Sequence, residues 1–169
     1  LDKENMFSAI WDFPENLQGA YKLGENIKLN QDYSSITGVV VAGMGGSAIG
    51  GDVVSILEKE CIDVPFIICR GYSVPNWVNK NTLVICSSYS GNTEETLTAY
   101  RECLKKGCHS IVISTGGELS ECANRSGVGV IKLPIGYQPR AAIGYSLSVL
   151  LLLFVELGLA ENKILIDLN

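Results

Sequence analysis

The sequence predicts a doubly wound α/β fold, in which helices cover both faces of a five-stranded parallel sheet to make a three-layer sandwich. Short apolar runs alternate with amphipathic segments along most of the 169 residues, as expected for parallel strands joined by crossover helices. Apolar residues make up 47% of the chain and charged residues 18%, a composition typical of a globular domain. A chain of this length buries about 70% of its unfolded surface, so its core needs no disulfide or metal for stability.

A helical arm is expected ahead of the sheet, in residues 1–34. Apolar residues recur at helical spacing from Asp2 to Asn30, and Pro14 interrupts them. Proline is tolerated in the first turn of a helix but not in its interior. The arm should therefore consist of two helices, the second starting near Pro14.

Strands and helices then alternate as far as residue 160. Five apolar runs predict strands near residues 37–43, 65–69, 82–87, 110–114 and 128–133. Amphipathic or apolar segments of helical length predict helices near residues 47–59, 93–106, 118–126 and 139–159. We assign residues 35–160 to the α/β domain, and residues 161–169 to a tail or the start of a linker to a second domain.

Two loops of small residues follow the first and third predicted strands. The first loop is Gly43-Met44-Gly45-Gly46-Ser47, and the second is Ser88-Tyr89-Ser90-Gly91-Asn92-Thr93. In a sheet of order 2-1-3-4-5 these strands are neighbours, and ligands bind where the winding reverses between them. Helix N-termini offer free backbone N–H groups and partial positive charge, and hydroxyls donate to phosphate oxygens. The loops together predict one site for a phosphate-bearing ligand.

Two other interpretations of these loops stay open. Residues 43–48 also match the dinucleotide fingerprint G-x-G-x-x-A, and Arg70 ends the second strand where an acidic residue usually grips the ribose, so the domain would suit NADP. That interpretation leaves the hydroxyl-rich second loop unexplained. A plain helix cap by Asn92 or Thr93 needs only one side chain, whereas this loop carries three hydroxyls.

The loops and a third motif resemble the SIS (sugar isomerase) domain family, which binds phosphosugars. Residues 88–96 match the signature S-x-S-G-x-T-x-[DE]-[ST], and residues 43–52 and 139–145 narrow the resemblance to the N-terminal half of the bifunctional phosphoglucose/phosphomannose isomerases. The resemblance implies a catalytic Arg140 beside C1 and C2 of the substrate, where a fixed cation stabilises an enediolate. It also implies a set of residues that hold the substrate phosphate: Gly46, Ser47, Ser88, Ser90 and Thr93.

The function implied by the resemblance is that of the phosphosugar-binding domain of an aldose–ketose isomerase. Such an enzyme interconverts glucose 6-phosphate or mannose 6-phosphate with fructose 6-phosphate, and it needs no metal or nucleotide cofactor. In that family the base is a glutamate and the ring-opening acid a histidine from a partner subunit, both in the second half of a longer protein. We assign neither role here, since His109 is expected at the amino edge of the sheet and Glu94 and Glu95 suit the first turn of a helix. A non-catalytic module that senses sugar phosphates is the alternative.

Charge and cysteine content indicate the setting of the protein. The net charge of −5 predicts no basic surface for nucleic acid. The uncharged stretch from Ala141 to Val155 is shorter than the roughly 18–20 residues that cross a bilayer, so we expect a buried helix and no membrane association. Its all-round apolar surface also suits a homodimer interface. The six cysteines form no C-x-x-C pair, so we expect reduced thiols in a cytoplasmic protein without a signal peptide.

Overall fold

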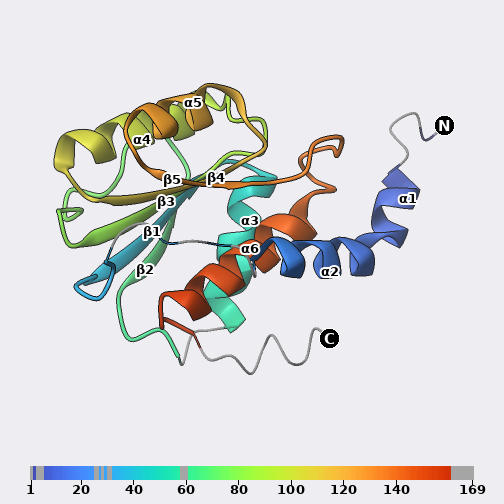
Figure 1. Ribbon diagram of the computed structural model, residues 1–169, viewed down its shortest axis with the longest axis horizontal. Helices are drawn as coiled ribbons and strands as arrows, with labels where there is room; N and C mark the ends of the chain where they lie inside the picture. Colours follow the sequence, from blue (N-terminus) through green and yellow to red (C-terminus); the bar gives the residue numbers. More distant parts are fainter. Residues whose placement is uncertain are drawn as a thin grey trace.

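Five parallel strands form a single sheet at the centre of the molecule, in the order β2-β1-β3-β4-β5. The computed structural model, shown in Figure 1, describes residues 2, 6–24, 27, 29, 32–57 and 61–160. The predicted fold class and strand order are confirmed. The strands are β1 (Gly38–Gly43), β2 (Phe66–Cys69), β3 (Thr82–Ser87), β4 (His109–Ser114) and β5 (Gly129–Lys132).

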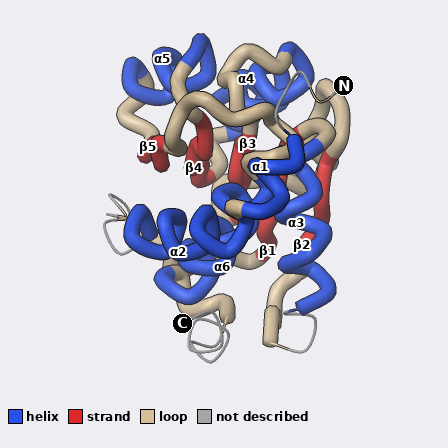
Figure 2. The backbone as a smooth tube through the Cα atoms, turned by 90° about the vertical axis from the view of Figure 1, so that its right-hand side faces the viewer, coloured by secondary structure: helices blue, strands red, loops and turns tan. Residues whose placement is uncertain are grey.

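Helices cover both faces of this sheet. Figures 1 and 2 show α2 (Phe13–Gly24), α3 (Gly46–Leu57) and α6 (Ile143–Glu156) on one face. The same views show α4 (Glu94–Lys106) and α5 (Gly117–Arg125) on the other. The short α1 (Met6–Trp11) projects from the body ahead of α2 (Figure 1).

The strands supply alternate residues to two separate hydrophobic clusters. Val39 and Val41 of β1 pack in the cluster that includes α6, whereas Val40 and Ala42 pack in the cluster that includes α4 and α5. Both faces of the central strands β1, β3 and β4 are therefore buried, whereas the edge strands β2 and β5 are half-buried. This burial explains why the strands are continuous apolar runs and do not alternate between apolar and polar residues.

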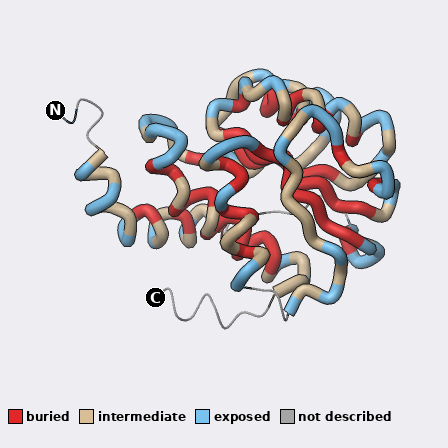
Figure 3. Tube along the Cα trace, turned by 180° about the vertical axis from the view of Figure 1, so that it is seen from behind, coloured by how far each residue is buried: buried red, intermediate tan, exposed pale blue. Residues whose placement is uncertain are grey.

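The helix α6 lies between α2 and α3 against the sheet, and it is largely buried (Figure 3). Ten of its residues between Gly144 and Phe154 are buried, and the Phe154 ring meets the Phe66 ring of β2 at a centroid distance of 5.1 Å. The prediction of a buried helix is confirmed. Because contacts within the chain account for the apolar sequence of α6, that sequence gives no separate support to a homodimer.

Several predicted boundaries shift by a few residues. The predicted helix at 139–159 begins only at Ile143, because residues 139–142 form turns in which the Gln138 carbonyl accepts hydrogen bonds from the N–H groups of Ala141 and Ala142. His109 is the first residue of β4, at the amino edge of the sheet, and it is half-buried. Residues 58–59 of another predicted helix and the predicted tail at 161–169 lie outside the described residues.

None of the six cysteines forms a disulfide, and Cys86 and Cys103 are fully buried in the cluster beneath α4. Across the described ranges, no helix combines the length and the apolar character that a bilayer crossing requires.

Candidate functional site

The two small-residue loops leave the sheet side by side. Gly43 at the end of β1 is the register partner of Ser87 at the end of β3, so both loops start at the same height on neighbouring strands. The first loop leads into α3 on one face of the sheet, and the second leads into α4 on the other face. Two helix N-termini, each with partial positive charge, therefore begin beside the point where the winding reverses. At α3 the N–H groups of Ser47 and Ala48 already donate to the carbonyls of Met44 and Gly45, whereas α4 has no side-chain cap.

A direct hydrogen bond joins the two loops. The backbone N–H of Tyr89 donates to Oγ of Ser47 over 3.1 Å, and Ser47 is only 9% exposed. A hydroxyl oxygen that accepts a hydrogen bond still has its own proton to donate. Ser90 is placed similarly, because its Oγ accepts from the N–H of Asn92 at 3.2 Å while the residue is exposed. Both hydroxyl protons are thus available to an anion at the loops.

Ser88 and Thr93 hydrogen-bond to each other across the second loop. Their hydroxyl oxygens are 2.8 Å apart, and Ser88 Oγ also accepts from the N–H of Gly91 at 3.1 Å. Ser88 is only 1% exposed, whereas Thr93 is half-buried at the loop surface. Ser88 therefore supports the loop from beneath, and its hydroxyl bond holds the side chain of Thr93, which lies nearer the surface.

The expected side-chain cap of α4 is not formed. Thr93 occupies the N-cap position, but its side chain makes no capping hydrogen bond because its hydroxyl bonds to Ser88. The Asn92 side chain acts on a different helix, since its Oδ1 accepts from the N–H of Glu118 in the first turn of α5. Both polar side chains fix the shape of the loop and do not cap the helix that follows it.

The second loop packs tightly against the turn between β4 and α5. Gly91 has φ +71°, and a Cβ at this position would overlap the carbonyl oxygen of Gly116. The Thr115 hydroxyl donates to the Tyr89 carbonyl over 2.7 Å. Only glycine combines this left-handed conformation with such a close approach, so glycine is required at position 91 by the packing as well as by the turn.

Arg140 reaches the first loop through a backbone contact. A Cβ at Gly46 would lie 2.8 Å from the Pro139 carbonyl oxygen and 3.5 Å from the Arg140 Cα, so the missing side chain is what lets these segments touch. Arg140 is exposed, three residues ahead of α6. Within the described part of the chain its guanidinium has neither an ion pair nor a hydrogen bond. A cation at the positive end of a helix is unfavourable unless an anion lies nearby.

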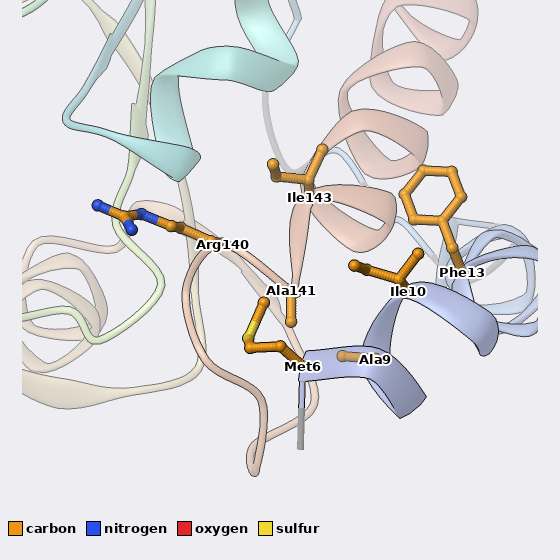
Figure 4. Close-up of a pocket in the computed structure, with 7 residues that line it drawn as sticks. All are labelled: Met6, Ala9, Ile10, Phe13, Arg140, Ala141 and Ile143. Carbon is orange, nitrogen blue, oxygen red and sulfur yellow. The ribbon is translucent and has the colours of Figure 1, made fainter. Parts of the chain in front are cut away.

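Figure 4 shows the direction of the Arg140 side chain. A pocket of about 270 Å³ lies between α1 and the start of α6, and Arg140 is one of its lining residues together with apolar side chains such as Met6 and Phe13. The guanidinium points away from these apolar side chains. The charged group is thus directed out of the apolar pocket.

The structure therefore brings the predicted site residues to one edge of the sheet. Arg140 lies against the first of the two hydrogen-bonded loops. The other five predicted residues lie in the loops themselves: Gly46, Ser47, Ser88, Ser90 and Thr93. His109 lies at the opposite, amino edge. Arg70, the residue that would suit NADP, forms an ion pair with Asp52 of α3. The sequence predicts no role for Tyr89, although this residue connects the two loops.

These features define an SIS-like α/β domain whose candidate site lies at the winding reversal. No protein-family model matches the chain. The C-terminal domain of glucosamine-fructose-6-phosphate aminotransferase from Francisella tularensis has the same fold, with a TM-score of 0.77 at 18% identity over 98% of this chain and 53% of that one.

Sequence similarity points to one group of enzymes. The chain is 49% identical over 156 residues to the bifunctional phosphoglucose/phosphomannose isomerase of Caldicellulosiruptor bescii, covering 92% of this chain and 46% of that protein. It is 43% identical over 140 residues to the protein of the same name from Thermoplasma acidophilum, covering 82% and 42%. The chain thus spans less than half the length of these relatives. The predicted resemblance to the bifunctional isomerases is confirmed.

Proposed function

We propose that the chain is the phosphosugar-binding domain of an aldose–ketose isomerase that interconverts glucose 6-phosphate or mannose 6-phosphate with fructose 6-phosphate. The observation that carries this proposal is the contact of Gly46 with Pro139 and Arg140. It sets a cation next to a loop that is itself hydrogen-bonded to the hydroxyl-rich loop. A phosphosugar is a ligand with an anion at one end and a reacting carbonyl group toward the other, and this site has matching groups for both.

In the proposed complex, the phosphate lies between the N-termini of α3 and α4. Ser47, Ser90 and Thr93 donate hydroxyl protons to its oxygens, and Gly46 contributes its backbone at the start of α3. Ser88 serves the same group by holding Thr93 and the N–H of Gly91 in place. Because the net charge of the chain is −5, local donors and not the overall field must hold the anion.

Arg140 acts in the proposed mechanism on the charge that develops during isomerisation. A base moves a proton between C2 and C1 of the open-chain sugar, and negative charge builds on the oxygens of the enediolate intermediate. A fixed guanidinium beside those oxygens stabilises the intermediate more than the uncharged carbonyl substrate, which lowers the barrier. Arginine stays protonated in proteins and so cannot itself be the base. We assign the base and the ring-opening acid to no described residue.

The resemblance to the isomerase family also leads us to propose that the protein is a cytoplasmic homodimer. The structure offers an apolar surface for self-association on α1, where three large side chains are 70% exposed or more: Phe7, Ile10 and Trp11.

A thermal-shift comparison of fructose 6-phosphate with NADP tests the proposed ligand class. Fructose 6-phosphate is expected to raise the unfolding midpoint in a concentration-dependent way, because a ligand that binds only the folded state stabilises it. NADP is expected to raise it no more than inorganic phosphate does, because the Arg70–Asp52 pair must break before Arg70 can grip a ribose phosphate. Stabilisation by NADP alone would replace the isomerase proposal with a dinucleotide-binding one.

A further inference from the structure

The side chain of Tyr89 connects the phosphate loop to the segment that carries Arg140. Tyr89 lies between Ser88 and Ser90, and its hydroxyl donates to the carbonyl oxygen of Pro134 at 2.9 Å. The same hydroxyl accepts from the backbone N–H of Tyr137 at 3.0 Å. Both partners belong to residues 134–140, the segment that runs from the end of β5 toward α6.

The segment 134–140 has little burial of its own. Its residues from 138 to 140 are exposed, as is Gly136, and Ile135 is 77% exposed. The Tyr137 ring packs on the Tyr145 ring of α6 with a centroid distance of 5.3 Å. A segment with few apolar contacts depends on specific hydrogen bonds for its position. The segment is also held by the contact of the Tyr137 and Tyr145 hydroxyls at 3.5 Å and by the close approach of Pro139 to Gly46. The two bonds of the Tyr89 hydroxyl tie the part of the segment nearest β5 to the phosphate loop.

The other contacts of Tyr89 fix the residue itself. Its N–H binds Ser47 and its carbonyl accepts from Thr115, so its backbone is held from both sides. Partial burial raises the pKa of the Tyr89 hydroxyl above its ordinary value, so the group stays protonated at neutral pH and continues to donate. Tyr89 thus belongs to the second loop and is hydrogen-bonded both to the first loop and to the segment that carries Arg140.

We infer that Tyr89 is a positioning residue for Arg140, because its hydroxyl pins residues 134 and 137 and thereby sets where the guanidinium meets the sugar end of the ligand. This inference rests on the proposed function of Arg140. Tyr89 occupies the variable position of the S-x-S motif, and the inference gives it a role distinct from phosphate binding. The phosphate end of the site depends on the loop backbone, whereas the reacting end depends on the Tyr89 hydroxyl.

The test uses Tyr89→Phe, which removes the hydroxyl and keeps the ring. Two ligands are titrated by calorimetry: inorganic phosphate, and 5-phospho-D-arabinonate, whose carboxylate mimics the charge of the enediolate. We expect Tyr89→Phe to weaken phosphoarabinonate binding about fivefold, as for the loss of a hydrogen bond, and to leave phosphate binding unchanged. Tyr33→Phe is the matched control, because the Tyr33 hydroxyl is buried near the amino edge of the sheet and has no hydrogen-bond partner among the residues that the structure describes.

A double-mutant cycle with Arg140→Ala separates positioning from general support. If Tyr89 acts through Arg140, adding Tyr89→Phe to Arg140→Ala costs no further affinity for phosphoarabinonate. An equal loss in both backgrounds, or an equal loss for phosphate and phosphoarabinonate, would overturn the inference.

Amide hydrogen exchange gives a readout that needs no sugar ligand. Tyr89→Phe should speed exchange at the Tyr137 N–H and leave the amides of β3 unchanged, and equal protection in both proteins would overturn the inference. Failure of the wild-type chain to bind phosphoarabinonate or fructose 6-phosphate would instead overturn the proposed function, and the exchange result would still decide whether Tyr89 holds the segment.

Discussion

Ser88, Ser90 and Thr93 share one loop, yet their hydroxyl groups have different environments. Ser88 is buried and bonded to both Thr93 and the N–H of Gly91. Ser90 is exposed, and its only hydrogen bond among the described residues is the one that it accepts from Asn92. In the proposed complex we therefore expect a ligand oxygen to contact Ser90 directly, and Ser88 to affect the ligand through the shape of the loop.

Ser90→Ala should weaken fructose 6-phosphate binding by about 1–2 kcal/mol, because a hydrogen bond to a charged group is lost. The unfolding midpoint should stay close to wild type, since the residue is exposed. Ser126→Ala is a matched control, because Ser126 is also exposed but follows α5 at the far end of the sheet. Equal affinities of wild type and Ser90→Ala in calorimetric titrations would remove Ser90 from the site.

The sequence predicts which residue types make up the loops better than it predicts which residues form hydrogen bonds with one another. The hydroxyl-rich loop is recognisable because serine, threonine and glycine are close together in the chain. The bond of Asn92 to the start of α5, and those of Tyr89 to Pro134 and Tyr137, join residues 26 to 48 positions apart. Such pairs depend on how two loops meet in space, and no local spacing signals them.

The helix α6 shows how an element far from the loops determines the stability of the domain. It packs between α2 and α3, and its Leu150 is fully buried against the position of Gly50 on α3. Gly50 has no room for a larger side chain, since a Cβ there would lie 3.2 Å from Leu150 Cδ1. The close approach of these two helices fixes α6, and with it the place where the Arg140 segment ends.

Leu150→Ala should lower the free energy of unfolding by about 2–5 kcal/mol, through lost burial and the cavity left behind. Leu104→Ala offers a comparison on α4, where the side chain is 42% exposed, and it should cost less than about 1 kcal/mol. Urea denaturation of both variants measures the difference. Similar losses in the two would mean that α6 is less tightly packed than its burial indicates.

The type and order of the elements are predictable here because each strand has an unbroken apolar run and each crossover helix has the length to return along the sheet. The residues at which the helices and strands begin and end are less predictable. The start of α6 depends on the Gln138 carbonyl closing a turn over Ala141 and Ala142. That turn competes with an earlier helix start, and propensity alone does not decide between them.

At the scale of the whole molecule, the proposed phosphate site and the Arg140 cation lie at one edge of the sheet, and the histidine lies at the other. Both loops and the Arg140 segment lie at the carboxyl edge of the sheet, while the single histidine lies at the amino edge. Glu94 and Glu95 start α4 at the edge where the loops lie. They occupy the first turn, where negative charge complements the helix dipole.

This chain alone is expected to bind fructose 6-phosphate without isomerising it, because Arg140 stabilises an enediolate but removes no proton. NMR of fructose 6-phosphate with the chain should show no glucose or mannose 6-phosphate beyond an enzyme-free control. Growth of both products would place a base within these residues, with Glu95 the first to substitute. Loss of that activity in Arg140→Ala would then tie the turnover to this site.

The hydrogen bond between Tyr89 and Ser47 has a consequence for how a ligand associates. It joins two loops from different parts of the chain, and the Ser88–Thr93 bond stiffens one of them further. These loops therefore lose their conformational entropy when the protein folds, so ordering them adds no further free-energy cost to ligand binding. We therefore expect the proposed sugar phosphate to bind without a loop having to close, at a rate set by its diffusion and orientation and not by a protein motion.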